Sequence, residues 1–264
     1  MSSDALNARN RVRRQYASVG DAYVRSAGHA AGSDLERMVR LAAPATTDVL
    51  LDLATGGGHV ASVFAPHVAM VIASDLTPEM LVHARLHLLE LRLERIAYLV
   101  ADSGAIPLQD DACDIVTCRI APHHFPDPAR FITESARVLR PEGRFVLVDS
   151  TVPEGDTGRF FNRFEKLRDP SHVKSLTMGE WEALIVDAGL TLTTAEPFRK
   201  RHDFDDWTTR SRVSLATRTD LERMVARADP AITAPFAFEW TSGGEPRLAA
   251  FSDTKTLFLA SKPV

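Results

Sequence analysis

Three consecutive glycines follow an acid at the end of an apolar run in LLDLATGGGHVAS, residues 50–62. Glycine lacks a Cβ and adopts backbone angles that strain other residues, so Gly56 and Gly58 suit a turn that a ligand approaches closely. Amide groups at the N-terminus of the following helix would point at that ligand. The stretch therefore predicts a ligand site at a strand-to-helix turn, with the carboxylate of Asp52 beside it.

Two kinds of cofactor use such a turn. The pattern Gly56-x-Gly58-x-x-Ala61 matches the fingerprint of a nicotinamide dinucleotide site. In that site a pyrophosphate lies against the turn, and the carboxylate of Asp52, four residues before Gly56, would repel it. A carboxylate attracts a cation, such as the sulfonium and α-amino groups of S-adenosylmethionine. Asp52 therefore favours the sulfonium cofactor over a nicotinamide cofactor.

Two further acids end the next two apolar runs. Asp75 follows the glycines by about twenty residues, where a carboxylate can accept both hydroxyls of a ribose. Asp102, in ADSGAIP, is placed to accept from an adenine amino group, with Ser103 beside it. Any one of these acids could simply cap a turn, as Asp often does at strand ends. Three of them around the glycines favour a cofactor site at the carboxyl edge of a parallel sheet.

The elements that position these acids follow a βαβ pattern. From about Thr47, short runs rich in Val, Ile and Leu alternate with longer amphipathic stretches, which is typical of a parallel sheet with helices on both faces. We predict strands at 48–53, 69–74, 96–101, 114–119, 144–149, 190–195 and 256–261. Helices are predicted from Pro78 to about residue 92, at 128–139, and in the stretches that begin at 159 and 178.

The chain divides into three segments of one α/β fold. Residues 1–45 form a helical, arginine-rich cap, with Tyr16 and Tyr23 on one helical face. Residues 46–152 form the cofactor-binding core. Residues 153–264 supply a lid, acceptor-pocket elements and the last strands, with a polar helical stretch around 204–228 and a hairpin about 242–247.

Composition limits the possible partners. The 264 residues carry a net charge of −4, with 45% hydrophobic and 25% charged residues, as in a globular protein. This balance gives no argument for a nucleic-acid partner, and no apolar run is long enough for membrane insertion. The N-terminal segment has arginines but no apolar h-region, so we expect a cytoplasmic protein.

The two cysteines are predicted to be small core residues. Cys113 and Cys118 lie five apart in one apolar run, and an odd offset along a strand sends side chains to opposite faces. We therefore expect neither a disulfide nor a metal site.

Five ordered motifs resemble those of the class I S-adenosylmethionine-dependent methyltransferases, most closely the small bacterial group similar to the quinone-biosynthesis enzymes (methyltransferase type 11). They are LLDLATGGGHVA, IASDLTPEML, VADSGAIPL, DIVTCRIAPHHFPDP and VLRPEGRFVLVDS, and the resemblance covers residues 48–150. One departure is Ala54, where many members have glycine. The resemblance implies a Rossmann-like, doubly wound, seven-stranded sheet whose last strand, at 256–261, is antiparallel.

The resemblance also implies roles for individual residues, with S-adenosyl-L-methionine as methyl donor and S-adenosyl-L-homocysteine as product. Asp52, Thr55, Gly56 and Gly58 hold the methionine half, and Asp75 holds the ribose. Leu76 and Met80 flank the adenine, Asp102 and Ser103 bond to its edge, and Arg119 approaches the methionine moiety through its backbone.

Candidate bases for the acceptor follow the fourth strand. The segment IAPHHFPDP lacks the Asn/Asp-Pro-Pro-aromatic pattern of enzymes that methylate nucleic-acid bases. His123 and His124 would point to opposite sides of an extended segment, so at most one faces the pocket. Histidine is a plausible base for a phenol, hydroxyl or carbon acid, although both rings could simply bond to loop backbone. Asp149 and His172 are further candidates, and each has a purely structural alternative.

Residues after the cofactor-binding core are the candidates for an acceptor pocket. Residues 159–178 are expected to form a lid, and Phe160, Phe161 and Phe164 suggest an apolar acceptor pocket, unless they are plain core. Trp207 and the hairpin would complete that pocket or form a homodimer contact. We therefore expect O- or C-methylation of a small, partly apolar molecule. The alternative is a fold-alike that binds the cofactor without methyl transfer, such as a cyclase, a decarboxylating enzyme or a binding module.

Overall fold

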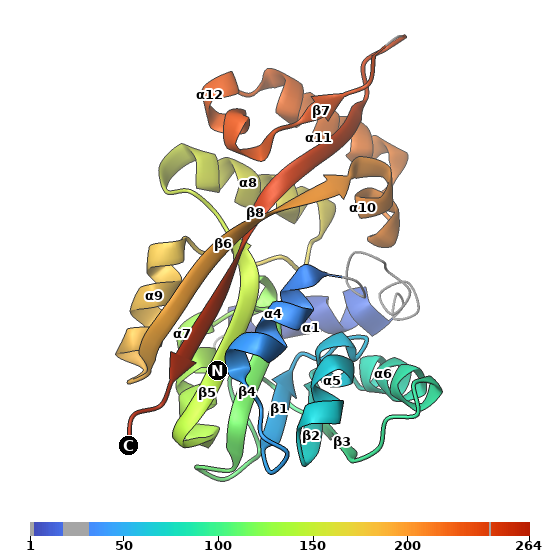
Figure 1. The fold of residues 1–264 in the computed structure, drawn as a ribbon. Helices are drawn as coiled ribbons and strands as arrows, with labels where there is room; N and C mark the ends of the chain where they lie inside the picture. Colours follow the sequence, from blue (N-terminus) through green and yellow to red (C-terminus); the bar gives the residue numbers. More distant parts are fainter. Residues whose placement is uncertain (1–2, 18–31, 243) are drawn as a thin grey trace.

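The computed structural model describes residues 3–17, 32–242 and 244–264, and they form one mixed sheet with helices on both faces (Figure 1). The strands are β1 Val49–Leu53, β2 Met70–Asp75, β3 Ile96–Val100, β4 Cys113–Arg119, β5 Leu139–Thr151, β6 Thr191–Asp203, β7 Glu239–Trp240 and β8 Leu248–Ser261. The α-helices are α1 Ser3–Ala17, α4 Ser33–Ala42, α5 His59–Phe64, α6 Pro78–Glu90, α7 Pro128–Val138, α8 Gly155–Arg168, α9 Met178–Asp187, α10 Phe204–Arg210, α11 Leu215–Arg227 and α12 Pro230–Thr233. Short 3-10 helices are η1 Ala65–His67, η2 Pro122–His124 and η3 Ala234–Phe236.

The strand order confirms the predicted sheet. The order is β3-β2-β1-β4-β5-β8-β6, in which β1 to β5 pair in parallel and β8 runs antiparallel between β5 and β6. The seven-stranded, doubly wound sheet with an antiparallel last strand is therefore present. The two-residue strand β7, which pairs with β8 next to the predicted hairpin, is an addition to it.

Apolar side chains cover both faces of this sheet. One cluster includes Phe131, Phe145 and Trp181 under α7 and α9, and the other includes Met38 and Phe64 under α4 and α5. All five side chains are fully buried. Burying both faces is what a parallel sheet requires, and it fixes the carboxyl ends of β1, β2 and β3 as one edge.

One prediction about the strands was wrong. Cys113 and Cys118 do not lie on opposite faces, because both pack in the Phe131 cluster. The pairing of β4 with β5 is irregular between Cys113 and Ile115, where β5 advances from Leu139 to Arg144, and the side-chain alternation is broken at that point. Both cysteines are buried and free, as the prediction of core residues required.

Strands β6 and β8 are much longer than predicted. They pair from Thr191–Ser261 to Asp203–Ala250 and extend past the sheet into the region of α8 and α10 (Figure 1). Residues of β6 alternate between exposed and half-buried over most of its length, because it is an edge strand. The polar end of β6, RKRHD, therefore carries little of the apolar signal by which a strand is recognised in sequence.

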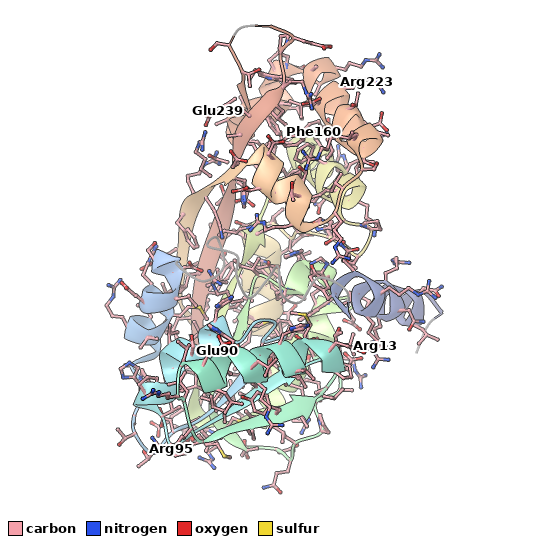
Figure 2. The ribbon with its side chains drawn as sticks, turned by 90° about the vertical axis from the view of Figure 1, so that its right-hand side faces the viewer. Arg13, Glu90, Arg95, Phe160, Arg223 and Glu239 are labelled. Carbon is pink, nitrogen blue, oxygen red and sulfur yellow. The ribbon has the colours of Figure 1, made fainter. Side chains whose placement is uncertain are left out.

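The three predicted phenylalanines belong to a third apolar core. Phe161 and Phe164 are fully buried, and Phe160 packs against their cluster together with Phe236 and Trp207. The ring of Phe164 stacks on Trp207 at 5.1 Å between centroids. Figure 2 places Phe160 among the helices at the far end of the molecule from Glu90 and Arg95. The structure therefore supports the plain-core interpretation of these residues.

Neither a membrane-spanning helix nor a metal-binding cluster is found among the described residues. No helix within residues 3–17, 32–242 or 244–264 is long and apolar enough to cross a bilayer. The same residues contain no group of three or more His, Cys, Asp or Glu side chains arranged to hold a metal ion. Tyr23, which was expected to share a helical face with Tyr16, lies outside the described residues.

We expect Phe164→Ala to destabilise the protein without weakening cofactor binding. Removing a fully buried ring from this core should lower the free energy of unfolding by about 3–5 kcal/mol. Chemical denaturation would measure this loss, and titration with S-adenosylmethionine would give the affinity. A variant of wild-type stability with impaired binding of a methyl acceptor would contradict the assignment of Phe164 to the core.

Candidate active site

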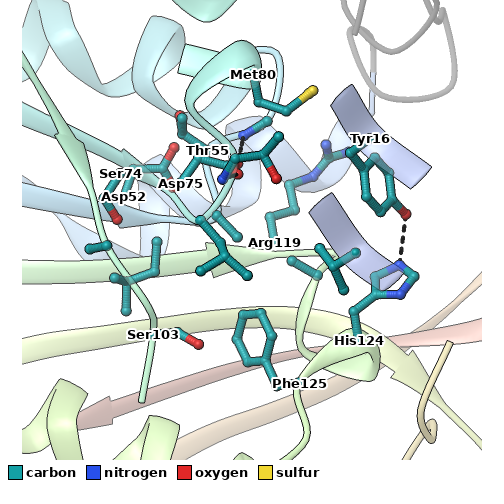
Figure 3. A pocket seen from close by; sticks show the side chains of 18 of the residues that line it. Tyr16, Asp52, Thr55, Ser74, Asp75, Met80, Ser103, Arg119, His124 and Phe125 are labelled. Atoms are coloured by element: carbon teal, nitrogen blue, oxygen red, sulfur yellow. Dashed lines mark hydrogen bonds between the residues drawn. The ribbon is translucent and has the colours of Figure 1, made fainter. Parts of the chain in front are cut away.

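A cavity of about 1130 Å³, including the part open to solvent, lies at the carboxyl edge of β1, β2 and β3 (Figure 3). Nine of the ten side chains or glycines predicted to hold a cofactor line it. They are Asp52, Thr55, Gly56, Asp75, Leu76, Met80, Asp102, Ser103 and Arg119. These residues come from separate parts of the chain and meet at the edge where ligands bind in doubly wound sheets.

Gly58 lies outside this cavity and has a packing role. It precedes α5 with a φ of +82°, and a Cβ built on it would lie 3.1 Å from Leu88 of α6. Gly56, with a φ of +55°, lines the cavity, and nothing but Met80 and a backbone oxygen of Ala54 lies within 4 Å of its built Cβ. Both turns need positive φ, and only Gly56 leaves backbone open toward a ligand.

Asp52 is a buried carboxylate, and only one of its oxygens is hydrogen-bonded within the described residues. Its Oδ1 accepts a hydrogen bond from the Thr117 hydroxyl at 2.9 Å, whereas its Oδ2 has no hydrogen-bond partner among the described residues. Burial raises the pKa of Asp52 to about 6, although the neighbouring hydroxyls of Thr55 and Thr117 lower it. A buried, unpartnered carboxylate oxygen is costly in an empty site, and a cationic ligand group would satisfy it.

Asp75 ties the glycine turn to the end of β2. Its Oδ2 accepts from the backbone N–H of Gly56 at 3.1 Å, and its Oδ1 accepts from the N–H of Thr77 at 2.9 Å. Each oxygen keeps a second lone pair for a ligand hydroxyl. Burial raises the pKa of Asp75 to about 6, against these backbone hydrogen bonds, which lower it. Asp75 thus shapes the turn and presents its carboxylate to the cavity.

The N-terminal helix α1 covers the cavity beside Asp102. Arg9, Val12 and Tyr16 line the cavity from α1, and their spacings of three and four residues place them on one helical face. The guanidinium of Arg9 forms an ion pair with Asp102. Asp102 also accepts from the N–H of Gly104 at 2.9 Å. The helical cap thus contributes directly to the wall of the site.

Arg119 ends β4 and anchors helix α4. Its Nε donates to Asp34 of α4 at 2.6 Å, and a terminal nitrogen donates to the other oxygen at 3.1 Å. Both side chains are buried, and the guanidinium helps to hold the pKa of Asp34 below its usual range although burial opposes it. The bidentate pair fixes α4 against the cavity edge.

The histidines occupy a turn and not an extended segment. His123 and His124 belong to η2, and their ring centroids lie 4.2 Å apart. The 3-10 turn explains why the rings are not directed to opposite sides, as the extended geometry predicted. Of the two, only His124 lines the cofactor cavity.

His123 forms a buried pair with Asp149 of β5. The distance from His123 Nδ1 to Asp149 Oδ1 is 2.6 Å, and Asp149 is fully buried. When Nδ1 carries the proton toward the carboxylate, Nε2 is the acceptor nitrogen. This arrangement orients the ring of His123.

His124 sits in a different environment from His123. Its Nε2 lies 2.8 Å from the hydroxyl of Tyr16, a contact drawn in Figure 3, and its Nδ1 lies 3.1 Å from the hydroxyl of Ser171. Burial, and then the neighbouring charge of His123, lower the pKa of His124 to about 3. Asp169, which accepts from the Ser171 hydroxyl and N–H, opposes this shift. His124 is therefore neutral at physiological pH.

His172 does not line the cofactor cavity. Its Nε2 lies 2.9 Å from the amide oxygen of Asn162 on α8, and its ring is 5.5 Å from that of His123. Burial and the two neighbouring histidines lower its pKa well below the usual range. The geometry is that of a neutral ring that ties α8 to the following loop.

A second cavity, of about 540 Å³, lies beyond the histidines. It shares Tyr16, Ile120 and His124 with the cofactor cavity, so the two spaces meet there. Predicted residues in its wall are His123 and Trp207, and none of the three phenylalanines of α8 lines it. Its other lining side chains are Ser150, Glu165, Arg168, Lys200, His202, Arg210 and Lys255.

Several residues that line the two cavities were not predicted from the sequence. Arg9 and Tyr16 had only a helical spacing to mark them, and Lys200 and Lys255 lie in polar stretches of β6 and β8. Their positions depend on strand pairing between β6 and β8, which sequence patterns did not reveal. The alternation of Lys200 and His202 along one strand was the available signal.

Comparisons with known proteins agree with this geometry. A family model described as a methyltransferase domain matches residues 51–147. The uncharacterized methyltransferase YcgJ of Bacillus subtilis is 34% identical over 197 residues, which are 74% of this chain and 76% of that protein. A demethylmenaquinone methyltransferase of Clavibacter sepedonicus is 33% identical over 136 residues, 51% of this chain and 55% of that protein.

Solved structures extend the likeness beyond the core. A candidate methyltransferase from Bacillus halodurans C-125 superposes with a TM-score of 0.84 and 36% identity, covering 88% of this chain and all of that one. The structure of YcgJ superposes with a TM-score of 0.82 and 29% identity, covering 87% of this chain and 98% of that one. The fold and the site define a methyltransferase. The chain belongs to the class I S-adenosylmethionine-dependent methyltransferases.

We expect Asp52→Asn to stabilise the ligand-free protein while weakening cofactor binding. A carboxyl with a raised folded-state pKa contributes stability at low pH that is lost as pH rises through the window from about 4 to 6. At pH 8 the neutral amide avoids this loss, so the free energy of unfolding should rise by about 1–3 kcal/mol. Below about pH 4 the advantage should vanish.

Denaturation of the variant and of the wild type at pH 4 and pH 8 measures whether the gain in stability is present at pH 8 and absent at pH 4. Asp187→Asn, at an exposed position of α9, is the matched control and should change neither stability nor binding. A loss of stability at pH 8 would show that the carboxylate of Asp52 is held by favourable interactions within the protein.

Proposed function

We propose that this protein transfers a methyl group from S-adenosylmethionine to a small-molecule acceptor. The observation that carries the proposal is the buried Oδ2 of Asp52, which has no partner among the described residues and lies in the wall of the glycine-turn cavity. A positively charged ligand satisfies that oxygen, whereas a pyrophosphate would be repelled by it. Members of the family use S-adenosylmethionine as their methyl donor.

We assign the cofactor's parts to the wall of the first cavity. Asp52, with Thr55 and Gly56, would hold the methionine half, and the backbone of Arg119 would approach it. Asp75 would accept from the ribose hydroxyls with its remaining lone pairs. The adenine would lie between Leu76 and Met80, with its edge toward Asp102 and Ser103. All of these residues line one continuous space, which supports the assignment.

S-adenosylmethionine, when bound, supplies an electrophilic methyl group on its sulfonium. What this chain adds is alignment of the nucleophile and exclusion of water. Helix α1 covers the cavity with Arg9, Val12 and Tyr16, and the second cavity opens beside Tyr16 and His124. An acceptor in the second cavity would therefore have one end at the cofactor cavity. Alignment of this kind can supply on the order of 7–11 kcal/mol of the barrier.

We assign the general base to His123. A base with a pKa near 3, as burial gives His124, takes a proton poorly at neutral pH. His123 lines the second cavity, and its Nδ1 lies 2.6 Å from the buried carboxylate of Asp149. Asp149 would orient the ring, as a positioning residue. His124 and Tyr16 would then shape the boundary between the two cavities.

The base leaves O- and C-methylation both open. A phenol, a hydroxyl or an acidic carbon would each lose its proton to His123 before or during attack. The demethylmenaquinone methyltransferases of Clavibacter sepedonicus and Thermus thermophilus match about half of the chain, and their activity supports quinol-like and phenolic acceptors as the first compounds to try.

Titration with S-adenosylmethionine, NAD and NADP tests the cofactor. We expect binding of the sulfonium compound alone, with a micromolar Kd. Gly56→Val should abolish it, because valine disfavours a φ of +55° and would place a branched side chain against the ligand. Asp75→Ala should weaken it by about 1.5–3 kcal/mol for each charge-assisted hydrogen bond lost. Preferential binding of NAD or NADP would overturn the proposal.

Turnover tests the chemistry. With an acceptor found by screening phenols, quinols and carbon acids, we expect His123→Ala to lower kcat by about 10²–10⁴-fold. The affinity for S-adenosylmethionine should stay within about twofold of wild type, since His123 does not line the cofactor cavity. Asp149→Asn should lower kcat and change its pH profile.

His67→Ala, at an exposed position of η1, is the control for the histidine substitution. Equal loss of turnover and cofactor affinity in His123→Ala would give that residue a structural role. Cofactor binding with no S-adenosylhomocysteine formed from any acceptor would favour a fold-alike without methyl transfer.

A further inference from the structure

The wall of the second cavity is strongly cationic. Arg168 of α8, Lys200 of β6, Arg210 of α10 and Lys255 of β8 all line it. Among the described residues that line this cavity, Glu165 is the only acid. Four separate elements therefore bring basic side chains to the second cavity, which adjoins the cofactor cavity.

Strand pairing sets the lysines on one face. In the β6–β8 ladder Lys200 pairs with Asp253, and Lys255 lies two residues further along β8, so the two lysines are diagonal neighbours. Lys255 pairs with Ser150 in the β5–β8 ladder and donates to its hydroxyl. His202 lies two residues from Lys200 on the same face. The result is a polar layer across three strands.

Two acids, Asp253 and Glu165, balance part of this charge. Asp253, which is buried and does not line the cavity, accepts from Lys255 at 2.7 Å and lies 3.0 Å from His202 Nε2. Glu165 pairs with Arg168 at 3.0 Å. Burial, and then the charges of Lys255 and Arg119, lower the pKa of Lys200 to about 8, although Asp34 and Asp253 oppose the shift.

The wall is also rigid on the arginine side. The guanidinium of Arg168 lies 4.5 Å above the ring of Trp207 and donates to Ser211 at 2.8 Å. Trp207 is itself packed into the aromatic core under α8. A fixed guanidinium beside lysine ammonium groups is suited to an oxyanion.

Basic side chains that four elements bring to one cavity, with a fixed guanidinium beside lysine ammonium groups, suit an anionic ligand. We propose that the second cavity binds an oxyanion of the methyl acceptor, a carboxylate or a phosphate, and holds the atom to be methylated at the Tyr16 and His124 end. This inference rests on the proposed function, and it replaces the expected apolar acceptor with an acidic one.

Matched pairs of small molecules test the proposal. Protein saturated with S-adenosylhomocysteine would be titrated with 3,4-dihydroxybenzoate against 3,4-dihydroxybenzamide, with phenyl phosphate against phenol, and with aliphatic pairs that differ in the same way. We expect the anionic members to bind at least tenfold more tightly than their neutral partners. The carboxylate and phosphate pairs distinguish the two sources of the oxyanion.

Two variants locate the effect. Lys200→Gln and Arg210→Gln should each reduce the preference for the anion about tenfold and leave the Kd of S-adenosylhomocysteine unchanged. Two positions are used so that a folding defect in one does not decide the result. Arg199→Gln, an exposed neighbour on β6 that does not line the cavity, makes the same change of charge and should keep the wild-type preference.

Two results would overturn the inference. One is that neutral members bind as tightly as anionic ones throughout the panel, and the other is that the preference survives in both variants. Failure of S-adenosylhomocysteine itself to bind would instead overturn the proposed function, and the anion preference would still be measurable without it.

Discussion

The site depends on two carboxylates that the sheet holds away from water. Asp52 and Asp75 lie at the ends of adjacent parallel strands, and burial raises the pKa of each to about 6. An acid in this state costs free energy in the absence of a ligand, and packed apolar clusters on both faces of the sheet offset the cost. Asp75 in turn holds the N–H of Gly56, so the same carboxylate that destabilises the edge also sets the shape of the turn. Stability and binding are therefore opposed at this edge.

The long β6–β8 ribbon gives the molecule its second space. Its lower part completes the main sheet between the two large cores, and its upper part packs under α8 and α10 against the aromatic core of Phe164 and Phe251 (Figure 1). Between these apolar regions the ribbon turns polar, at Lys200 and Lys255. A ribbon that served only to pack would have no reason to bury lysines there. The basic side chains at this point of the ribbon therefore serve a purpose other than stability.

The core half of the fold could be predicted from sequence because its signals are local. Buried parallel strands are continuous apolar runs, and Asp52, Gly56 and Asp75 stand at fixed places relative to them. The second cavity could not be predicted in this way. Its lysines lie on an edge strand and its partner, their meeting is set by pairing across more than fifty residues, and polar alternation is a weak strand signal. The prediction for the cysteines failed for a related reason, since the irregular pairing of β4 with β5 near Cys113 breaks the side-chain alternation without any mark in the sequence.

The histidine cluster illustrates how environment divides the work between identical side chains. The three ring centroids lie 4.2 to 6.4 Å from one another, and at such distances a charge on one ring disfavours charge on the others. Burial already keeps His124 and His172 neutral. Asp149 is hydrogen-bonded to His123 and orients its ring. Under the proposed assignment of the base, the two neutral rings, bonded to Tyr16 and Asn162, would leave His123 as the residue that receives the proton of the acceptor.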